Sequence, residues 1–252
     1  DLISVHSAPF QHRDHVLRAV GAGKHVLCDK PFGRNADEAR EMLAAAEAAG
    51  VLHFLNYEFR HQPARLKARE LIQSGAIGQF RHMATNSFAN YLHGRPHGWL
   101  QDAERGGGWI GAYGSHVIDA LHWFTGAEVA QCGGVLRTDA ASHPDDAGNP
   151  VPATAEDAYS LWFTTENGVS ASLDVAFSLP VAQPQRMQFI GSEGLIELID
   201  NNILTLYRGG AEPERFDLSP PAGERVWPAL RGWIEAVGSA IASGQQITPN
   251  FN

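Results

Sequence analysis

Residues 22–31, AGKHVLCDKP, hold a β-strand that passes without a break into a charged turn. The strand, residues 24–28, is short and mostly apolar, which is typical of a parallel strand buried on both faces. Asp29, Lys30 and Pro31 follow where the strand ends. Open α/β sheets bind their ligands at the carboxyl ends of their strands, so this turn is predicted to line a binding site.

The sequence leaves two interpretations of Lys30. A partly buried lysine can bring a charge to a substrate oxygen or a nucleotide, and burial lowers its pKa toward values that allow proton transfer. The alternative is an exposed lysine in an ordinary strand-to-helix turn, because lysines are usually exposed.

The segments around this strand alternate between strands and helices. Apolar strands are predicted over residues 1–6 and 51–55, and helices with one apolar face over residues 12–20 and 35–47. Strands and helices that alternate at this spacing form a parallel sheet with right-handed crossovers. Because residues 1–6 already have the pattern of a buried strand, the chain is expected to begin in the middle of a fold.

Beyond Tyr57 the pattern changes. A helix is predicted over residues 63–75 and a strand over residues 79–89. The turn Glu166-Asn167-Gly168 lies between two stretches of alternating apolar residues and predicts a hairpin, and a last helix is predicted over residues 227–242. The predicted fold class is α/β: an incomplete Rossmann-type parallel sheet followed by an α+β domain with a large, mainly antiparallel open sheet.

The composition excludes several classes of protein. The 252 residues are 44% hydrophobic and 19% charged, with a formal net charge of -9, so a basic surface for nucleic acid or an anionic membrane is not expected. No apolar run reaches the length of a membrane span. The two cysteines, Cys28 and Cys132, are too few for a disulfide framework and predict a reducing, cytoplasmic location, with both thiols buried as small apolar side chains.

A second polar region lies in residues 105–119, RGGGWIGAYGSHVID. Three consecutive glycines let the backbone approach a ligand closely, and the helix after them places His116 and Asp119 at positions i and i+3 on one face. A carboxylate beside an imidazole fixes its tautomer and raises its basicity, as a general base requires. The alternative is a structural histidine at a helix N-terminus with local polar neighbours, because such pairs also occur away from active sites.

Two histidines and two tryptophans are further candidates for ligand binding. The histidines of residues 93–97, HGRPH, have the i, i+4 spacing of metal ligands, but Gly94 and Pro96 prevent the helix that would align them. No metal site is therefore predicted there, and a substrate-side loop is favoured. Trp99 and Trp109 are candidates to stack on a sugar ring or a nicotinamide, with packing in the core as the alternative.

Together these motifs resemble the Gfo/Idh/MocA family, named after glucose-fructose oxidoreductase, inositol dehydrogenase and rhizopine catabolism. Residues 22–31 are similar to its signature AGKHVLCEKP, with Asp29 in place of the glutamate. Residues 106–119 are similar to its GGG…D.G.H..D segment, and Arg60 and residues 75–78 fit the segment between. The resemblance extends over nearly the whole chain.

The resemblance implies an NAD(P)-dependent oxidoreductase with two domains. Residues 1–58 would be the C-terminal part of a dinucleotide-binding Rossmann domain. Residues 59–252 would be a substrate-binding and oligomerisation domain that forms a homodimer or homotetramer through its open sheet. The cofactor, NAD or NADP, would be bound by Ser7, Ala8, Pro9, His12, Asp29, Lys30 and Pro31.

The implied reaction is hydride transfer between NAD(P) and a carbinol or carbonyl carbon of a sugar, cyclitol or related polyol. His116 would be the general base, Lys30 would polarise the reacting oxygen, and Asp119 would orient the imidazole. The substrate would be bound by Lys30, Arg60, Trp99, Trp109 and His116.

Two departures from the family pattern leave alternatives open. The position four residues before His116, acidic in the family, is Ala112 here, which cannot hold a proton. The glycine-rich dinucleotide fingerprint and its acidic residue are expected before residue 1, so the sequence does not discriminate NAD from NADP. One alternative function is a catalytically silent sugar or nucleotide sensor, favoured by Ala112 and opposed by Lys30 and His116. Another is an NAD-recycling glycoside hydrolase.

Overall fold

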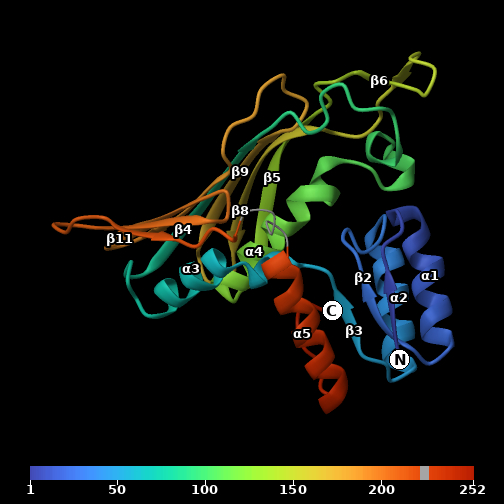
Figure 1. Ribbon diagram of the computed structural model, residues 1–252, viewed down its shortest axis with the longest axis horizontal. Coiled ribbons are helices and arrows are strands. Elements are labelled where there is room, and N and C mark those ends of the chain that lie inside the picture. Colours follow the sequence, from blue (N-terminus) through green and yellow to red (C-terminus); the bar gives the residue numbers. More distant parts are fainter. Residues whose placement is uncertain (222–226) are drawn as a thin grey trace.

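The computed structural model describes residues 1–221 and 227–252 and contains two main sheets (Figure 1). The first part of the chain forms a small parallel sheet of three strands, and the later part forms a sheet of eight strands. The predicted fold class, an α/β chain with a small parallel sheet followed by a large and mainly antiparallel one, is confirmed.

The parallel half follows the predicted alternation of strands and helices. Its elements are β1 (Leu2–Val5), α1 (Pro9–Gly21), β2 (His25–Cys28), α2 (Ala36–Ala48) and β3 (His53–Leu55). The strands are ordered β1-β2-β3, and Cys28 at the end of β2 pairs with Val5 on one side and Leu55 on the other. The carboxyl ends of the three strands therefore lie side by side at one edge of the sheet.

Local sequence explains where the two helices of this half begin. The Asn35 side chain caps α2 by accepting a hydrogen bond from the backbone N–H of Glu38 at 3.0 Å. Helix α1 begins at Pro9, earlier than the predicted residue 12. A proline suits the first position of a helix because its φ is preset and its missing N–H would have no partner there.

The large sheet is mixed rather than purely antiparallel. Its strands are β4 (Phe80–Phe88), β5 (Val129–Arg137), β8 (Ala158–Thr165), β9 (Ser170–Ala176), β10 (Arg186–Gly191), β11 (Gly194–Ile199), β12 (Ile203–Arg208) and β13 (Glu214–Asp217), in the spatial order β13-β12-β11-β10-β4-β9-β8-β5. Strands β4 and β9 run parallel, and the other neighbours are antiparallel. The hairpin predicted around Asn167 is present as β8 and β9. A separate small hairpin joins β6 (Ser142–Pro144) and β7 (Pro150–Pro152).

Helices cover one face of the large sheet and leave the other open. The covering helices are α3 (Pro63–Gln73) and α4 (Ser115–Thr125), which lie together on one side of the sheet in Figure 1. Ala68 of α3 and Leu121 of α4 belong to the same buried core as Phe189 of β10. The opposite face carries exposed aromatic side chains such as Trp162, which is 49% exposed.

The last helix, α5 (Trp227–Ser243), packs against the parallel half. Trp233 of this helix is fully buried, and its ring meets that of Phe54 in β3 edge-on, with centroids 6.1 Å apart. Leu27 of β2 belongs to the same core cluster. None of the helices in the described part of the chain is long and apolar enough to cross a bilayer.

Short helical elements occupy much of the segment between β4 and α4. They include two short 3-10 helices, η2 (Trp99–Gln101) and η3 (Ala103–Arg105). A π-helical turn, η4 (Ile110–Gly114), leads directly into α4, and another 3-10 helix, η1 (Glu58–His61), follows β3. These short elements fix the backbone that surrounds the candidate site.

The two cysteines differ in exposure. Cys28 is buried at the end of β2, as predicted. The prediction that Cys132 is buried is wrong, because Cys132 lies on β5, a strand at the edge of the large sheet, where its side chain is exposed.

Replacing Trp233 by alanine is expected to lower the free energy of unfolding by about 3–5 kcal/mol, because it removes a fully buried aromatic ring and leaves a cavity against β3. Urea unfolding followed by circular dichroism measures the change. Ile234→Ala, at the next position of the same helix but 46% exposed, is the control and is expected to cost less than about 1 kcal/mol. A loss no larger than that of the control would contradict this packing of α5.

Candidate active site

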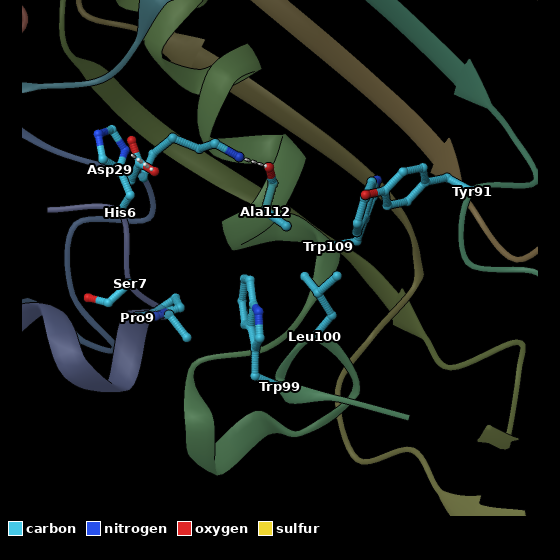
Figure 2. A pocket seen from close by; sticks show the side chains of 11 residues that line it. His6, Ser7, Pro9, Asp29, Tyr91, Trp99, Leu100, Trp109 and Ala112 are labelled. Atoms are coloured by element: carbon cyan, nitrogen blue, oxygen red, sulfur yellow. Dashed lines mark hydrogen bonds and ion pairs between the residues drawn. The ribbon is translucent and has the colours of Figure 1, made fainter. Parts of the chain in front are cut away.

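A cavity of about 280 Å³ lies at the carboxyl ends of β1 and β2, between the parallel half and the rest of the molecule (Figure 2). It is lined by His6, Ser7, Ala8, Pro9, Asp29, Lys30, Tyr91, Trp99, Leu100, Trp109 and Ala112. The structure therefore brings together most of the residues predicted to bind cofactor or substrate, namely Ser7, Ala8, Pro9, Asp29, Lys30, Trp99 and Trp109.

Lys30 is the central charged group of this cavity. It is half-buried, and its Nζ donates a hydrogen bond to the backbone carbonyl oxygen of Ala112 at 2.5 Å, drawn as the dashed line that ends at Ala112 in Figure 2. Burial lowers the pKa of the ammonium below its ordinary value, and the carboxylates of Glu58 and Asp29 oppose this shift. The interpretation of Lys30 as an exposed turn residue is therefore wrong.

Asp29 is held by two side chains that the sequence analysis did not select. Its carboxylate lies 2.9 Å from Nδ1 of His6 and accepts a hydrogen bond from Nδ2 of Asn56 at 2.7 Å. His6 follows β1 and Asn56 follows β3, so the sheet-edge argument that selected Lys30 also applies to them. No comparable signal was available for Tyr91, which lies in a turn, or for Leu100, which lies in the short 3-10 helix η2.

His12 does not line the cavity but joins two of the loops that form it. Its imidazole is fully buried, with Nδ1 3.0 Å from the carbonyl oxygen of Pro31 and Nε2 2.7 Å from that of Ser7. Pro31 also lies outside the cavity lining. His12 is predicted to bind the cofactor, but its side chain does not face the cavity. It holds the loop after β1 against the loop after β2.

His116 lies in the first turn of α4 and is only 4% exposed. Phe59 stacks on its ring with centroids 4.2 Å apart, and Tyr57 approaches edge-on at 5.6 Å. Burial lowers the pKa of the imidazole well below its ordinary value, and the positive charges of Lys30 and Arg65 lower it further. The ring is therefore neutral near pH 7, and its Nδ1 has no hydrogen-bond partner among the described residues.

Lys30 lines the cavity, whereas His116 lies behind the cavity wall, one helical turn beyond Ala112. Ala112, whose carbonyl oxygen accepts the hydrogen bond from Lys30, precedes His116 by one helical turn. His116 itself is not among the residues that line the cavity. Its ring packs between η1 and α4.

Asp119 binds Arg60 instead of His116. Its carboxylate accepts hydrogen bonds from Arg60 Nε at 2.9 Å and Nη2 at 2.6 Å, and within residues 1–221 and 227–252 no hydrogen bond reaches His116 Nδ1. The prediction that Asp119 orients the imidazole is wrong, because a two-point bond to a guanidinium is stronger than a single bond to a neutral ring. Burial raises the pKa of Asp119, and the hydrogen bonds and charge of Arg60 oppose the rise.

The Arg60–Asp119 pair belongs to a second cavity of about 550 Å³. This cavity is lined by Leu55, Tyr57, Arg60, Arg69, Asp119, His122, Trp123, Gly126, Glu128, Thr248, Pro249, Asn250 and Asn252. Arg60, predicted to bind substrate, is thus not brought together with Lys30 or the tryptophans. No group of three histidine, cysteine or acidic side chains that could hold a metal ion occurs in the part of the chain that the structure describes.

Aromatic side chains line the side of the first cavity away from β1 and β2. Trp109 is 7% exposed, and its ring centroid lies 5.3 Å from that of Tyr91 and 4.5 Å from that of Phe177. Trp99 stands between Pro9 and Leu100 in the view of Figure 2. An apolar wall that faces an ammonium and other polar groups suits a sugar ring, whose C–H face packs on aromatic rings while its hydroxyls bond to polar atoms.

Family models match both halves of the chain. The model described as the GFO/IDH/MocA C-terminal domain matches residues 66–197. The model described as an oxidoreductase family with an NAD-binding Rossmann fold matches residues 1–57.

Individual relatives agree with these matches. The 1,5-anhydro-D-fructose reductase of Ensifer adhaerens is 33% identical over 97% of this chain and 72% of its own length. An uncharacterized oxidoreductase of Synechocystis sp. is 30% identical over 82% of this chain, which spans only 57% of that relative. Among solved structures, levoglucosan dehydrogenase in complex with NADH and L-sorbose has the same fold, with a TM-score of 0.87 at 22% identity over 99% of this chain and 73% of that one.

His12→Ala is expected to lower the free energy of unfolding by about 1–3 kcal/mol, because a buried ring is removed and the carbonyl oxygen of Ser7 or Pro31 that accepts its N–H loses that donor. Gln11→Ala, on the same helix but exposed, is the matched control and is expected to change it by less than about 0.5 kcal/mol. Urea unfolding measures both variants. Equal, small effects would show that His12 does not hold these loops.

Proposed function

Because the chain belongs to the Gfo/Idh/MocA family of oxidoreductases, we propose that it transfers a hydride between NAD or NADP and a carbinol or carbonyl carbon of a sugar, cyclitol or related polyol. The observation that carries this proposal is the partly buried Lys30 ammonium in a cavity with an aromatic wall, at the carboxyl edge of a Rossmann-type sheet. The reductase of a 1,5-anhydro sugar among its relatives supports the substrate class.

The residues at the ends of β1 and β2 fit a dinucleotide. Helix α1 begins at Pro9 without a side-chain cap on its first N–H groups, and such a helix start attracts a phosphate group. Ser7, Ala8, Pro9, Asp29 and Lys30 would hold the cofactor. When bound, the cofactor supplies the acceptor or donor of the hydride. In this proposal, residues 1–58 form the cofactor half and residues 59–252 the substrate half.

Oxidation of a carbinol removes a hydride from carbon and a proton from oxygen. We assign the proton to His116, because its imidazole is neutral and follows Ala112 of the cavity lining by one helical turn. Lys30 donates a hydrogen bond to the reacting oxygen and stabilises the negative charge that develops there as the proton leaves. In the direction of reduction, the protonated His116 returns the proton to the same oxygen.

A sugar or nucleotide sensor of the same fold is the second candidate, and Ala112 is the observation that favours it. This position provides only a backbone carbonyl oxygen to Lys30 and no acidic side chain. A sensor would bind nucleotide and sugar in the same cavity without turnover. The retained Lys30 and the neutral His116 favour the enzyme.

The open face of the large sheet is our candidate for self-association. Trp162 of β8 is 49% exposed, Val135 of β5 is 60% exposed, and Tyr207 of β12 is 39% exposed. The pairing register places the three side chains on the face that α3 and α4 leave free. Exposed apolar groups on a sheet face are typical of protein interfaces, so we propose a homodimer or homotetramer formed through this face.

Lys30→Met and His116→Ala are each expected to lower kcat by at least about 100-fold, because one loses the charge at the reacting oxygen and the other the proton acceptor. Turnover is followed at the absorbance of the reduced nicotinamide with aldoses, anhydro sugars and cyclitols. His122→Ala, on α4 but at the second cavity, is the control and is expected to keep its turnover. Binding of cofactor and sugar without any turnover by the native chain would favour the sensor, and full activity of His116→Ala would remove His116 as the base.

Sedimentation of the native chain is expected to give a dimer or a tetramer, and Trp162→Glu is expected to shift it toward the monomer, since a charge is placed on the open face. Leu66→Glu, a change at an exposed residue of the covering helix α3, serves as the control. A native chain that sediments as a monomer at all concentrations would rule out this interface.

A further inference from the structure

Arg65 of α3 is a buried cation without an acidic partner. Its side chain is 1% exposed, and its Nε donates a hydrogen bond to Oδ1 of Asn201 at 2.7 Å. No carboxylate within residues 1–221 and 227–252 forms an ion pair with it, and its Nη2 has no hydrogen-bond partner there. A buried charge of this kind lowers the stability of the fold unless other groups compensate it.

The guanidinium of Arg65 is linked to His116 through one aromatic ring. Its central carbon lies 5.1 Å from the centroid of the Phe59 ring, within the range of a cation–π contact. The same Phe59 ring stacks on the His116 imidazole at 4.2 Å, with the two planes 24° apart. Arg65, Phe59 and His116 therefore form a contiguous set in which the cation and the imidazole share one aromatic neighbour.

We propose that Arg65 is a positioning residue for His116: its buried charge, acting across the Phe59 ring, keeps the imidazole neutral and fixed so that it can accept the hydroxyl proton. This inference rests on the role proposed above for His116. It assigns to Arg65 no contact with substrate or cofactor.

Among the other charged and titratable groups near His116, Glu58 of η1 opposes the charges of Lys30 and Arg65, but burial raises the pKa of its carboxyl and favours the uncharged form. Lys30 approaches from the loop after β2 and adds a second positive charge. Tyr57 meets the ring edge-on from the start of η1 and is uncharged, since burial raises the pKa of its hydroxyl to about 12. The nearest acid on α4, Asp119, is already paired with Arg60. A protonated His116 is therefore disfavoured by two cations and releases its proton readily after each turnover.

The test compares Arg65→Met with Arg65→Lys. Methionine removes the charge and keeps an unbranched apolar side chain, whereas lysine keeps the charge and loses the guanidinium. NMR follows the titration of the His116 ring signals in the native chain, in Arg65→Met and in Arg65→Lys. These signals are identified by their absence in His116→Ala. The pH dependence of kcat/KM is measured in parallel.

Arg65→Met is expected to move both the His116 titration and the acid limb of kcat/KM to higher pH. If the imidazole approaches the ordinary histidine pKa of about 6.5, kcat/KM at pH 6.0 falls about fourfold below the variant's own plateau. The native chain and Arg65→Lys are expected to remain on their plateaus at this pH. An unchanged titration in Arg65→Met, or an equal shift in Arg65→Lys, would overturn the proposal.

A second variant tests the proposal if Arg65→Met does not fold, and the NMR titration separates it from the role proposed for His116. If Arg65→Met does not fold, Asn201→Gly decides: Asn201 has a φ of 57°, which glycine adopts freely. The change removes the acceptor that fixes Arg65 and one hydrogen bond to Gln185 Oε1, and it leaves the Arg65 charge in place. A smaller shift in the same direction supports the proposal, and none refutes it. Because the NMR titration does not depend on turnover, it reports the Arg65–His116 coupling even if His116→Ala retains activity and the proposed base is wrong.

Discussion

The hydrogen bond from the Lys30 ammonium to the carbonyl oxygen of Ala112 is the contact on which the rest of the site depends. It joins the carboxyl end of β2 to the π-helical turn before α4, across 82 positions of sequence. Withdrawing an ammonium from water is costly unless other groups compensate the charge, and among the described residues one carbonyl oxygen accepts a hydrogen bond from it. A partly buried ammonium at the cavity wall can stabilise negative charge on a substrate oxygen. The contact joins two residues that line the cavity, and it holds the Lys30 ammonium where the proposed reaction needs it.

Buried positive charge also organises the surroundings of His116. Arg60 is neutralised by Asp119, whereas Lys30 and Arg65 have no acid at hydrogen-bond distance in the described chain. Their combined field, together with burial, favours the neutral imidazole. The same field favours a negative oxygen in the transition state of hydride transfer. Without an acidic side chain at position 112, these cations keep the imidazole unprotonated, whereas a carboxylate beside it would raise its pKa.

Sequence patterns predicted what depends on local order along the chain. The alternation up to Leu55 and the Asn-Gly turn after β8 fixed the sheets, because strand burial and turn geometry are local properties. The carboxyl edge of a parallel sheet predicts Lys30 at the site, and His6, which follows β1, lies at the same edge. The spacing of His116 and Asp119 predicted one shared helix face, yet the carboxylate bonds to Arg60, which lies 59 positions earlier. No spacing on a single helix can reveal a competitor that reaches it from another element. Tyr91 lies in a turn, where no periodic pattern marks its place in the site.

The most direct test of this account is the titration of Lys30 itself. Reaction of the folded chain with acetic anhydride at a series of pH values, quantified for each lysine by mass spectrometry, gives the pH at which the Lys30 amine becomes reactive, while Lys24 and Lys67 normalise the reagent. The account predicts that the midpoint for Lys30 lies below the ordinary lysine pKa, because burial disfavours the ammonium. A midpoint at or above the ordinary value would mean that Lys30 is solvated, and it would contradict the cavity and the mechanism built on it.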